Sequence, residues 1–207
     1  MQVTLDMPQL KLETLSIGSL ERIALDVPPG EVICLSGPSG SGKSRLLRAV
    51  ADIEPHSGEI SLGAIEQNKI PGHQWRRQVM LVPAQSAWWY ETVGEHFHKP
   101  MEEALKVFGF PAEATGWQVS RLSSGEKQRL ALIRALSYEP SVLLLDEPTA
   151  NLDTDTTNKV EKWLLIKIKK HQYPVIWVAH SKEQIQRVGS RHFEIQGSHL
   201  VEREISQ

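Results

Sequence analysis

The chain has 207 residues, with 23 basic and 25 acidic side chains, so its formal net charge at pH 7 is −2. This length suits one domain with a substantial hydrophobic core, and the near-neutral charge disfavours a nucleic-acid partner, since phosphate backbones attract basic proteins. The single cysteine, Cys34, excludes an intramolecular disulfide and a cysteine-rich zinc site. We therefore expect one domain over residues 1–207.

No stretch of the sequence approaches the ~18 consecutive apolar residues that a transmembrane helix needs. The longest dense apolar run, residues 142–145, ends at Asp146. The N-terminal segment MQVTLDMPQL has an acid and a proline where a signal peptide has basic residues and an apolar core. We expect a soluble chain whose role at a membrane depends on a partner.

The first half of the chain begins with two predicted strands. Apolar residues nearly alternate over 10–15 and again over 20–27, and Pro28-Pro29-Gly30 follows as a turn. The apolar run at 32–35 ends in a glycine-rich loop, which is typical of a buried parallel strand. Residues 44–51 then have helical character, so this part reads as strand, loop and helix.

The rest of the chain alternates strands and helices. Apolar runs at 79–82, 142–145 and 175–179 predict further buried strands. Helices are predicted over residues 101–110, 123–136 and 154–170. Strands separated by helices imply right-handed crossovers and a mostly parallel sheet covered on both faces. The tail alternates loosely at 192–195 and 200–203, and we expect it to form edge strands.

A phosphate-binding loop is the most specific motif. Residues 37–44, GPSGSGKS, match G-x-x-x-x-G-K-[ST] in full, between a predicted strand and a predicted helix. Glycines let the loop turn backbone N–H groups toward a triphosphate, and the helix adds its positive end. Lys43 is predicted to reach the β- and γ-phosphates, and the Ser44 hydroxyl to bind Mg²⁺. The predicted nucleotide-binding residues here are Gly37, Pro38, Ser39, Gly40, Ser41, Gly42, Lys43 and Ser44.

Two carboxylates, Asp146 and Glu147, directly follow the apolar run at 142–145. Open parallel sheets bind ligands beyond the carboxyl ends of their strands. Asp146 is therefore predicted to approach Mg²⁺, and Glu147 to lie beside the γ-phosphate and polarise the attacking water. The alternative is a pair of solvated acids at a strand end, which the phosphate loop makes the poorer interpretation.

The sequence LSSGEKQ, residues 122–128, opens the predicted helix at 123–136. Ser123 reads as an N-cap and Glu126, three residues later, completes a capping box, which is a sufficient structural explanation. The functional alternative is that free N–H groups at this helix start bind an anion such as a γ-phosphate. Because the chain already has one phosphate loop, that phosphate would belong to the nucleotide of a second copy.

These motifs together resemble the ATP-binding subunit of ATP-binding-cassette (ABC) transporters. The matching elements are GPSGSGKS, Gln85 after a strand, LSSGEKQR, VLLLDEP, ANLD at 150–153 and His180 after a strand, in the family's order and spacing. The resemblance implies an α/β fold: a P-loop NTPase core with a mostly parallel sheet, an antiparallel β-subdomain and a small helical subdomain. It also implies ATP as substrate, with Mg²⁺.

Roles for single residues follow from the resemblance. Gln85 senses Mg²⁺ and the attacking water, and His180 steadies the γ-phosphate, so the implied catalytic residues are Glu147, His180 and Gln85. The implied Mg²⁺ ligands are Ser44, Gln85 and Asp146. Ser123 and Gly125 contact the γ-phosphate across a dimer, and Asp153 couples its two sites. ATP buried between two copies then drives closure, and hydrolysis drives opening.

The implied partners are a second copy of the chain in the ATP-bound state and an integral membrane permease, with no nucleic acid. The implied location is the cytoplasmic side of the bacterial inner membrane. The stretches RALSYEPSVLLLDEPTANLD and VIWVAHSKEQI are similar to short ATP-binding subunits of bacterial iron-export systems, which implies export of iron or another metal ion. Lipoprotein release, peptide export, a DNA- or ribosome-associated ABC ATPase and a nucleotide-dependent regulator remain open.

The sequence departs from the family pattern in the base contact and the signature. The family has an aromatic residue ahead of the phosphate-loop strand that stacks on adenine, whereas this chain has none before Trp75. Ile17 or Leu15 is expected to take that place. Ser124 stands in the signature where glycine is commonest.

The third departure is a short helical region. Only 36 residues, 86–121, separate Gln85 from the signature, which predicts a reduced helical subdomain. Trp88, Trp89 and Tyr90 lie in it, near the groove that in the family receives a helix of the membrane subunit. They are either anchors for that partner or packing residues of the subdomain, and both interpretations stay open.

Histidines provide one candidate site residue, His180. The other seven, His96 and His98 among them, show no spacing typical of a metal site. We expect these histidines on the surface.

Overall fold

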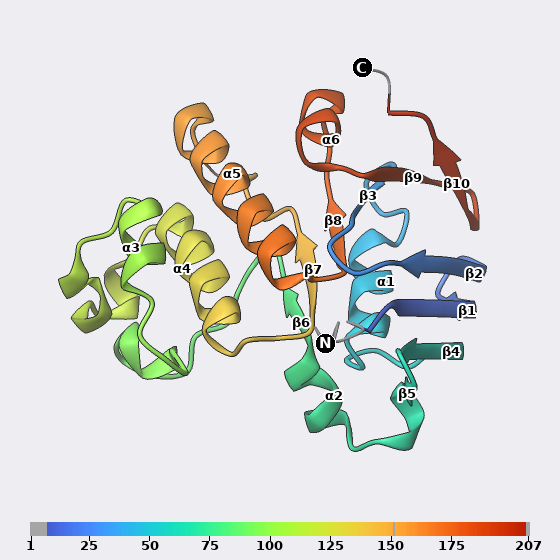
Figure 1. The fold of residues 1–207 in the computed structure, drawn as a ribbon, viewed down its shortest axis with the longest axis horizontal. Helices are drawn as coiled ribbons and strands as arrows, with labels where there is room; N and C mark the ends of the chain where they lie inside the picture. Colours follow the sequence, from blue (N-terminus) through green and yellow to red (C-terminus); the bar gives the residue numbers. More distant parts are fainter. Residues whose placement is uncertain (1–7, 151, 206–207) are drawn as a thin grey trace, which may run out of the picture.

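Figure 1 shows the fold in a computed structural model, which describes residues 8–150 and 152–205. The strands are β1 (Leu10–Ile17), β2 (Leu20–Val27), β3 (Val32–Ser36), β4 (Ser57–Leu62), β5 (Ile65–Glu66), β6 (Val79–Val82), β7 (Val142–Asp146), β8 (Val175–Val178), β9 (Arg191–Gln196) and β10 (His199–Arg203). The helices are α1 (Lys43–Val50), α2 (Gly72–Gln78), α3 (Glu102–Val107), α4 (Ser124–Ser137), α5 (Thr154–His171) and α6 (Lys182–Val188). Short 3₁₀ turns span Gln67–Lys69, Gly94–His96, Ala112–Gly116 and Val119–Arg121.

The central sheet has six strands in the order β10-β9-β3-β8-β7-β6. The pairs β9–β3, β3–β8, β8–β7 and β7–β6 are parallel, and β10 is antiparallel to β9. Every residue of β7 and β8 is buried, because helices cover both faces, as continuous apolar runs predict. The mostly parallel sheet is confirmed.

The tail corrects one prediction. It forms two strands, but only β10 is at an edge, since β9 lies between β10 and β3. The ring of His192 on β9 hydrogen-bonds the Ser36 hydroxyl of β3 at 2.7 Å. The loose alternation of the tail did not reveal this interior place, which depends on a strand more than 150 residues away.

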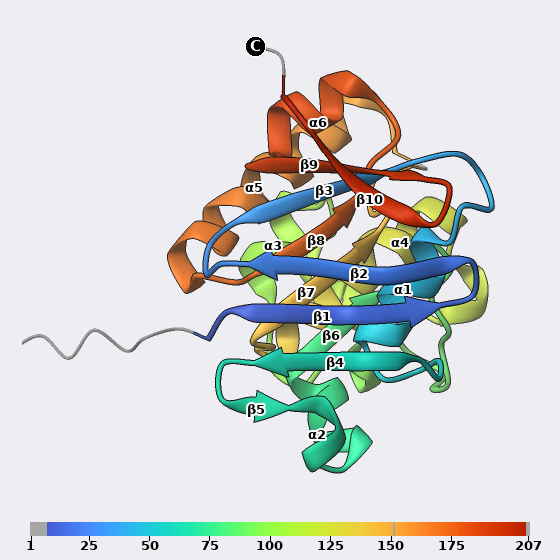
Figure 2. The ribbon, with the colours of Figure 1, turned by 90° about the vertical axis from the view of Figure 1, so that its right-hand side faces the viewer.

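A second, antiparallel sheet has the order β2-β1-β4-β5. It lies over α1, which fills the space between the two sheets (Figure 2). Leu46 and Leu47 of α1 are fully buried in a cluster that also contains Leu10 of β1 and Ile176 of β8. This sheet is the implied β-subdomain, although β4 and β5 were not among the predicted strands.

The helices follow the predictions for long segments and depart from them for short ones. The helix predicted over 101–110 is only Glu102–Val107, because Gly109 has φ +80° and ends the turn. The unpredicted α2 is anchored by Trp75, whose Nε1 donates to the Val50 carbonyl at 2.8 Å. Across residues 8–150 and 152–205, we find no helix with the length and apolar content needed to cross a bilayer.

Candidate functional site

The carboxyl ends of β3, β8 and β7 form the candidate site. Leu35 of β3 pairs with Val178 of β8, and Val178 pairs in turn with Asp146 of β7. The phosphate loop follows β3, His180 follows β8 and Glu147 follows β7. The sheet register therefore brings three motifs to one edge, although the phosphate loop and Glu147 are more than 100 residues apart in sequence.

The phosphate loop closes around Lys43, the first residue of α1. Lys43 is 7% exposed, and its Nζ donates to the carbonyl oxygens of Gly37 at 2.8 Å and Pro38 at 2.9 Å. Gly40 and Gly42 have φ +78° and +104°, a region that glycine enters at little cost. The ammonium is thus satisfied by backbone oxygens, so the loop holds its shape in the protein alone.

Two buried polar atoms at this edge bear on whether the site suits ATP and Mg²⁺. Ser41 Oγ and Asp146 Oδ1 are buried and have no hydrogen-bond partner among the described residues. An unpartnered buried polar atom is costly, whereas a hydroxyl can donate to a phosphate oxygen and a carboxylate oxygen suits Mg²⁺. Ser44 is half-buried in the first turn of α1. These residues fit both groups.

Glu147 and His180 contact each other at the site. His180 Nε2 lies 2.5 Å from Glu147 Oε1, with side chains 54% and 30% exposed. Glu147 has φ +52°, a conformation that costs a non-glycine residue about 1 kcal/mol or more. Backbone strain therefore coincides with the predicted general base, and His180 orients the carboxylate that would accept a proton from water.

The signature helix begins with the predicted capping box. Ser123 Oγ accepts from the Glu126 N–H at 3.3 Å, and Glu126 Oε2 accepts from the Ser123 N–H at 2.8 Å. The Ser123 hydroxyl, which donates to Glu126 Oε2 at 2.7 Å, and the Ser123 N–H together hold the pKa of Glu126 below its usual value. Ser124 is exposed and Gly125 half-buried in the first turn of α4. The structural role of Ser123 is confirmed, and the contact with a second copy's nucleotide remains a prediction.

Asp153 also caps a helix, a role that the sequence analysis missed. Its Oδ1 accepts from the Thr156 N–H at 2.9 Å at the start of α5. That hydrogen bond lowers the pKa of Asp153. The signal was present, since an aspartate directly before a predicted helix is a common N-cap. Its neighbour in the motif, Asn151, lies outside the described residues.

Gln85 follows β6, the strand beside β7, and is exposed. In the segment that follows Gln85, the His96 ring contacts three aromatic side chains. The His96 ring centroid lies 4.8, 4.9 and 5.0 Å from those of Trp88, Trp89 and Tyr90. We call these four residues the aromatic cluster.

His96 corrects the prediction that histidines other than His180 lie on the surface. It is 0% exposed, and its Nε2 accepts from the backbone N–H groups of Trp89 and Tyr90, each at 3.0 Å. Its Nδ1 therefore carries the proton and donates to the Thr92 carbonyl at 2.9 Å. The ring is buried because it hydrogen-bonds the backbone N–H and carbonyl groups of the turn around it. His98, in contrast, is exposed, as predicted.

The aromatic cluster shows the packing that one interpretation predicts, and the anchoring of a membrane partner stays a prediction. Trp88 is half-buried and packs against the core, whereas Trp89 is 59% and Tyr90 is 52% exposed. The Arg134 guanidinium lies over the rings of Trp88 and Trp89, 4.6 and 4.9 Å from their centroids. Beside Trp89 is a hollow of about 240 Å³ between β6 and α4, which we call the β6–α4 groove.

Ile17 and Leu15, the expected substitutes for a base-stacking aromatic, are both buried. Leu15 is 0% and Ile17 is 5% exposed, within the cluster that packs the antiparallel sheet on α1. A buried side chain offers no face to a base. The near-alternation of apolar residues in β1 places both side chains on the face that packs inward.

A buried network behind Glu147 was also missed. Glu161 of α5 is 2% exposed, and its Oε1 accepts from Gln184 Nε2 at 2.8 Å, which also donates to Thr149 Oγ1 at 2.9 Å. Arg187 Nε donates to the second carboxylate oxygen at 2.8 Å. The network ties the loop after Glu147 to α5 and α6. No sequence pattern distinguishes Glu161 from the solvated glutamates of a helix.

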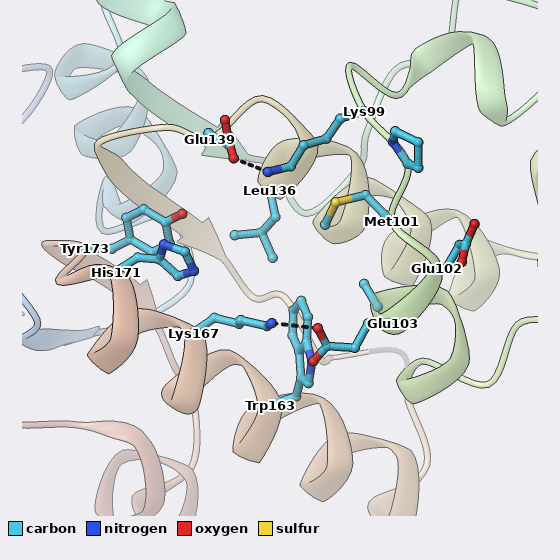
Figure 3. A pocket seen from close by; sticks show the side chains of 12 residues that line it. Lys99, Met101, Glu102, Glu103, Leu136, Glu139, Trp163, Lys167, His171 and Tyr173 are labelled. Carbon is cyan, nitrogen blue, oxygen red and sulfur yellow. Dashed lines mark hydrogen bonds and ion pairs between the residues drawn. The ribbon is translucent and has the colours of Figure 1, made fainter.

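A separate cavity of about 230 Å³ lies between α3, the end of α4 and α5 (Figure 3). Leu136 points into it, and the Trp163 ring forms part of its wall. Lys167 pairs with Glu103 at 2.9 Å, and Lys99 pairs with Glu139 at the rim. None of the predicted site residues lines this cavity, so it is distinct from the strand-end site.

Comparisons with known proteins agree with this geometry. A family model described as ABC transporter matches residues 20–150. The chain is 35% identical over 182 residues to Protein STAR1 of Oryza sativa subsp. japonica, covering 82% of this chain and 53% of that protein. It is 34% identical over 193 residues to the sulfate/thiosulfate import ATP-binding protein CysA of Bacillus cereus, covering 84% and 53%. The chain thus spans about half the length of these relatives.

Two further likenesses extend over most of the chain. The probable iron export ATP-binding protein FetA of Escherichia coli (strain K12) is 31% identical over 179 residues, covering 80% of each chain. A structure described as a dimeric post-hydrolysis state of the ATP-binding cassette MJ0796 bound to ADP and Pi matches with a TM-score of 0.83 at 23% identity, covering 96% of this chain and 99% of that one. This second likeness shows the fold. The chain therefore belongs to the ABC transporter family, as an ATP-binding domain of the kind that hydrolyses ATP.

Proposed function

We propose that this chain is the ATP-hydrolysing subunit of an ABC transporter and powers a separate membrane permease. The observation that carries the proposal is the meeting of the phosphate loop, Asp146, and the Glu147–His180 pair at one sheet edge. Residues 1–207 act in this scheme as one ABC ATP-binding domain, in which residues 86–121 supply a reduced helical subdomain. The domain acts from the cytoplasmic side of the membrane, through its partner.

Hydrolysis in this site depends on positioned charge. Lys43 leaves its two carbonyl partners and binds the β- and γ-phosphate oxygens of ATP. Ser44, Gln85 and Asp146 would hold Mg²⁺, which would supply positive charge beside the phosphates. Glu147 takes the proton of the attacking water, while His180 holds the carboxylate in place and then contacts the γ-phosphate. Since His180 is half-exposed, it can move without disturbing the core.

A second copy completes the site. Ser123 and Gly125 stand at the start of α4, where uncompensated N–H groups and the helix dipole favour an anion. The capping box engages the N–H groups of Ser123 and Glu126 and leaves the others of the first turn for such a ligand. Two chains arranged head to tail would place each signature on the other's γ-phosphate, and Asp153 would lie near the contact. ATP then stabilises the pair, and hydrolysis releases it.

The permease docks at the β6–α4 groove. Trp89 lines it, and the ring centroid of exposed Tyr90 lies 6.0 Å from that of Trp89. Large exposed aromatic side chains are common anchors of protein interfaces. Arg134 stacks on Trp89 and donates from Nη1 to the Ala87 carbonyl at 2.7 Å, so the wall of the groove is held rigid. Gln85, one of the proposed Mg²⁺ ligands, lies in sequence between Val82 and Ser86, which both line the groove. Docking and hydrolysis are thereby coupled through one short loop.

The cargo that we favour is iron or another metal ion, moved outward. The support is the Escherichia coli relative, which the chain matches over four fifths of both lengths. Relatives named for sulfate import match the same domain, because the permease and not this domain selects the cargo. Purification of the permease with this chain, followed by transport of iron into inverted vesicles, tests the cargo.

Substitution of Glu147 tests the ATPase itself. Glu147→Gln is expected to bind Mg²⁺–ATP, to lose hydrolysis by at least about a hundredfold and to form a stable dimer with ATP, measured by light scattering. Glu113→Gln, at an exposed position, is the matched control and should behave as the native chain. Native-rate hydrolysis by Glu147→Gln would exclude Glu147 as the base. A variant that stays monomeric with saturating ATP and permease would refute the dimer.

A further inference from the structure

The two sides of the phosphate loop differ in what surrounds them. On one side, β8 and β7 lead to His180 and Glu147, where the proposed function places the γ-phosphate. On the other side is the β1–β2 turn, since a Cβ built on Gly42 would lie 3.3 Å from Leu20 of β2. Figure 2 shows this turn and the start of α1 at the same end of the molecule. A nucleotide with its γ-phosphate beside Glu147 therefore extends its base toward the β1–β2 turn.

Arg45 lies across that turn. It directly follows Ser44 in the first turn of α1. A Cβ built on Gly18, which has φ +60°, would lie 2.2 Å from Arg45 Nη1 and 2.8 Å from Cζ. The guanidinium thus occupies the space that a side chain at position 18 would fill. Gly18 is needed here both for its backbone conformation and for this close approach.

Glu54 fixes the guanidinium in this place. Arg45 Nε donates to Glu54 Oε1 at 2.7 Å, and Arg48 Nε donates to Glu54 Oε2 at 3.0 Å. The Arg45 side chain nevertheless remains 47% exposed. A hydrogen bond through Nε lies in the plane of the guanidinium and leaves its faces free for stacking. The group is therefore both oriented and accessible.

The base has no aromatic partner from the N-terminal part of the chain. The first 74 residues contain no Phe, Tyr or Trp, and Leu15 and Ile17 are buried beneath the turn. A guanidinium stacks on aromatic rings and on nucleobases. Resting on the proposed function, we propose that Arg45, held by Glu54 against Gly18, stacks on the base of the bound nucleotide.

The binding affinities for Mg²⁺–ATP and Mg²⁺–tripolyphosphate distinguish a contact with the base from a contact with the phosphates, because tripolyphosphate has no base. Arg45→Ala is expected to weaken ATP binding about fivefold, as for loss of a half-exposed cation–π contact, and to leave tripolyphosphate binding unchanged. Arg45→Lys should resemble Arg45→Ala, since it keeps the charge but not the planar group. Isothermal titration calorimetry gives both dissociation constants.

Two further variants control the test. Arg48→Ala removes the other hydrogen bond to Glu54 and should leave both affinities unchanged. Gly18→Ala drives a Cβ into the Arg45 guanidinium, the movable end of a long side chain, and should reproduce Arg45→Ala while circular dichroism stays native. Equal losses for both ligands in Arg45→Ala, or native ATP affinity in Arg45→Lys, would overturn the stacking. A native chain that bound neither ligand would refute the proposed function instead.

Discussion

The phosphate loop and the aromatic cluster are stabilised in different ways. The loop depends on glycine conformations, on a helix start and on Lys43 bonded to two backbone carbonyls. The aromatic cluster depends on one buried ring, His96, which satisfies two backbone N–H groups. The difference predicts that side-chain changes in the loop remove function and preserve the fold, whereas changes at His96 remove local structure and spare hydrolysis.

Lys43→Ala is expected to have the largest effect of the changes in the phosphate loop. It is expected to lower the affinity for Mg²⁺–ATP by at least about a hundredfold, because a charge-assisted phosphate contact is lost. The unfolding free energy without nucleotide should change by about 1 kcal/mol or less, since the lost bonds end on carbonyls near solvent. Calorimetry and urea unfolding measure the two effects. A variant that binds ATP normally would contradict the assignment of the site.

Removal of the exposed aromatic side chains tests the aromatic cluster in the same way. Trp89→Ala with Tyr90→Ala is expected to abolish most permease-stimulated transport, because interface anchors of this kind contribute about 2 kcal/mol or more each. Basal ATPase activity should stay within about twofold, since neither side chain reaches the strand ends. Transport in vesicles and phosphate release are the measurements. Unchanged transport would exclude the docking role of the β6–α4 groove.

Glu161 tests how firmly the loop after Glu147 is held. Glu161→Gln keeps the size of the side chain but removes the charge that Arg187 neutralises. We expect a loss of about 2 kcal/mol in the unfolding free energy and a lower rate of hydrolysis with little change in ATP affinity. Urea unfolding and steady-state kinetics measure these effects. Exposed Glu183, on α6, changed in the same way provides the control.

The protonation of His96 links the aromatic cluster to pH. Burial lowers the pKa of His96, and Arg134 lowers it further, while the hydrogen bond to Thr92 and the charge of Glu95 oppose the shift. The unfolded chain therefore takes up this proton at a higher pH than the folded chain does. The stabilisation is complete above about pH 6.5, the ordinary histidine pKa, and is lost as the pH falls through the folded pKa.

His96→Ala is expected to cost about 2 kcal/mol at pH 7.5, because two backbone N–H groups lose their acceptor. The difference between the variant and the native chain should shrink as the pH falls from 7 to 5. Thermal unfolding across this pH range measures it, and other histidines cancel in the comparison. A difference that did not depend on pH would contradict the neutral state of the ring. ATP affinity should remain native.

Glu147→Gly gives the smallest expected change in stability and tests the backbone strain at the predicted general base. Glycine adopts φ +52° freely, so relief of backbone strain should raise the unfolding free energy by about 1 kcal/mol. Loss of the contact with His180 offsets part of this gain. Hydrolysis should be lost, as in Glu147→Gln. Urea unfolding of the two variants compares them directly. A glycine variant less stable than the glutamine variant would show that position 147 stores no strain.

Local patterns in the sequence were sufficient for the site motifs and for the longer elements. The phosphate loop is a contiguous glycine pattern, and β7 and β8 are continuous apolar runs, so each is encoded by neighbouring residues. The capping box of α4 is equally local, since Ser123 and Glu126 satisfy each other's N–H groups within one turn. The family resemblance was carried by these same short segments.

Tertiary contacts decided everything that depends on partners far along the chain. Strands β4 and β5 and helix α2 contain too few apolar residues to be predicted from sequence. They form because β1 offers a pairing partner to β4, and the Val50 carbonyl accepts from Trp75 of α2. The burial of His96 and Glu161, and the place of Arg45 against Gly18, likewise depend on which groups lie opposite. A sequence reveals which groups a residue carries, but only the packed chain reveals which of them lose water, and that loss determines their energies.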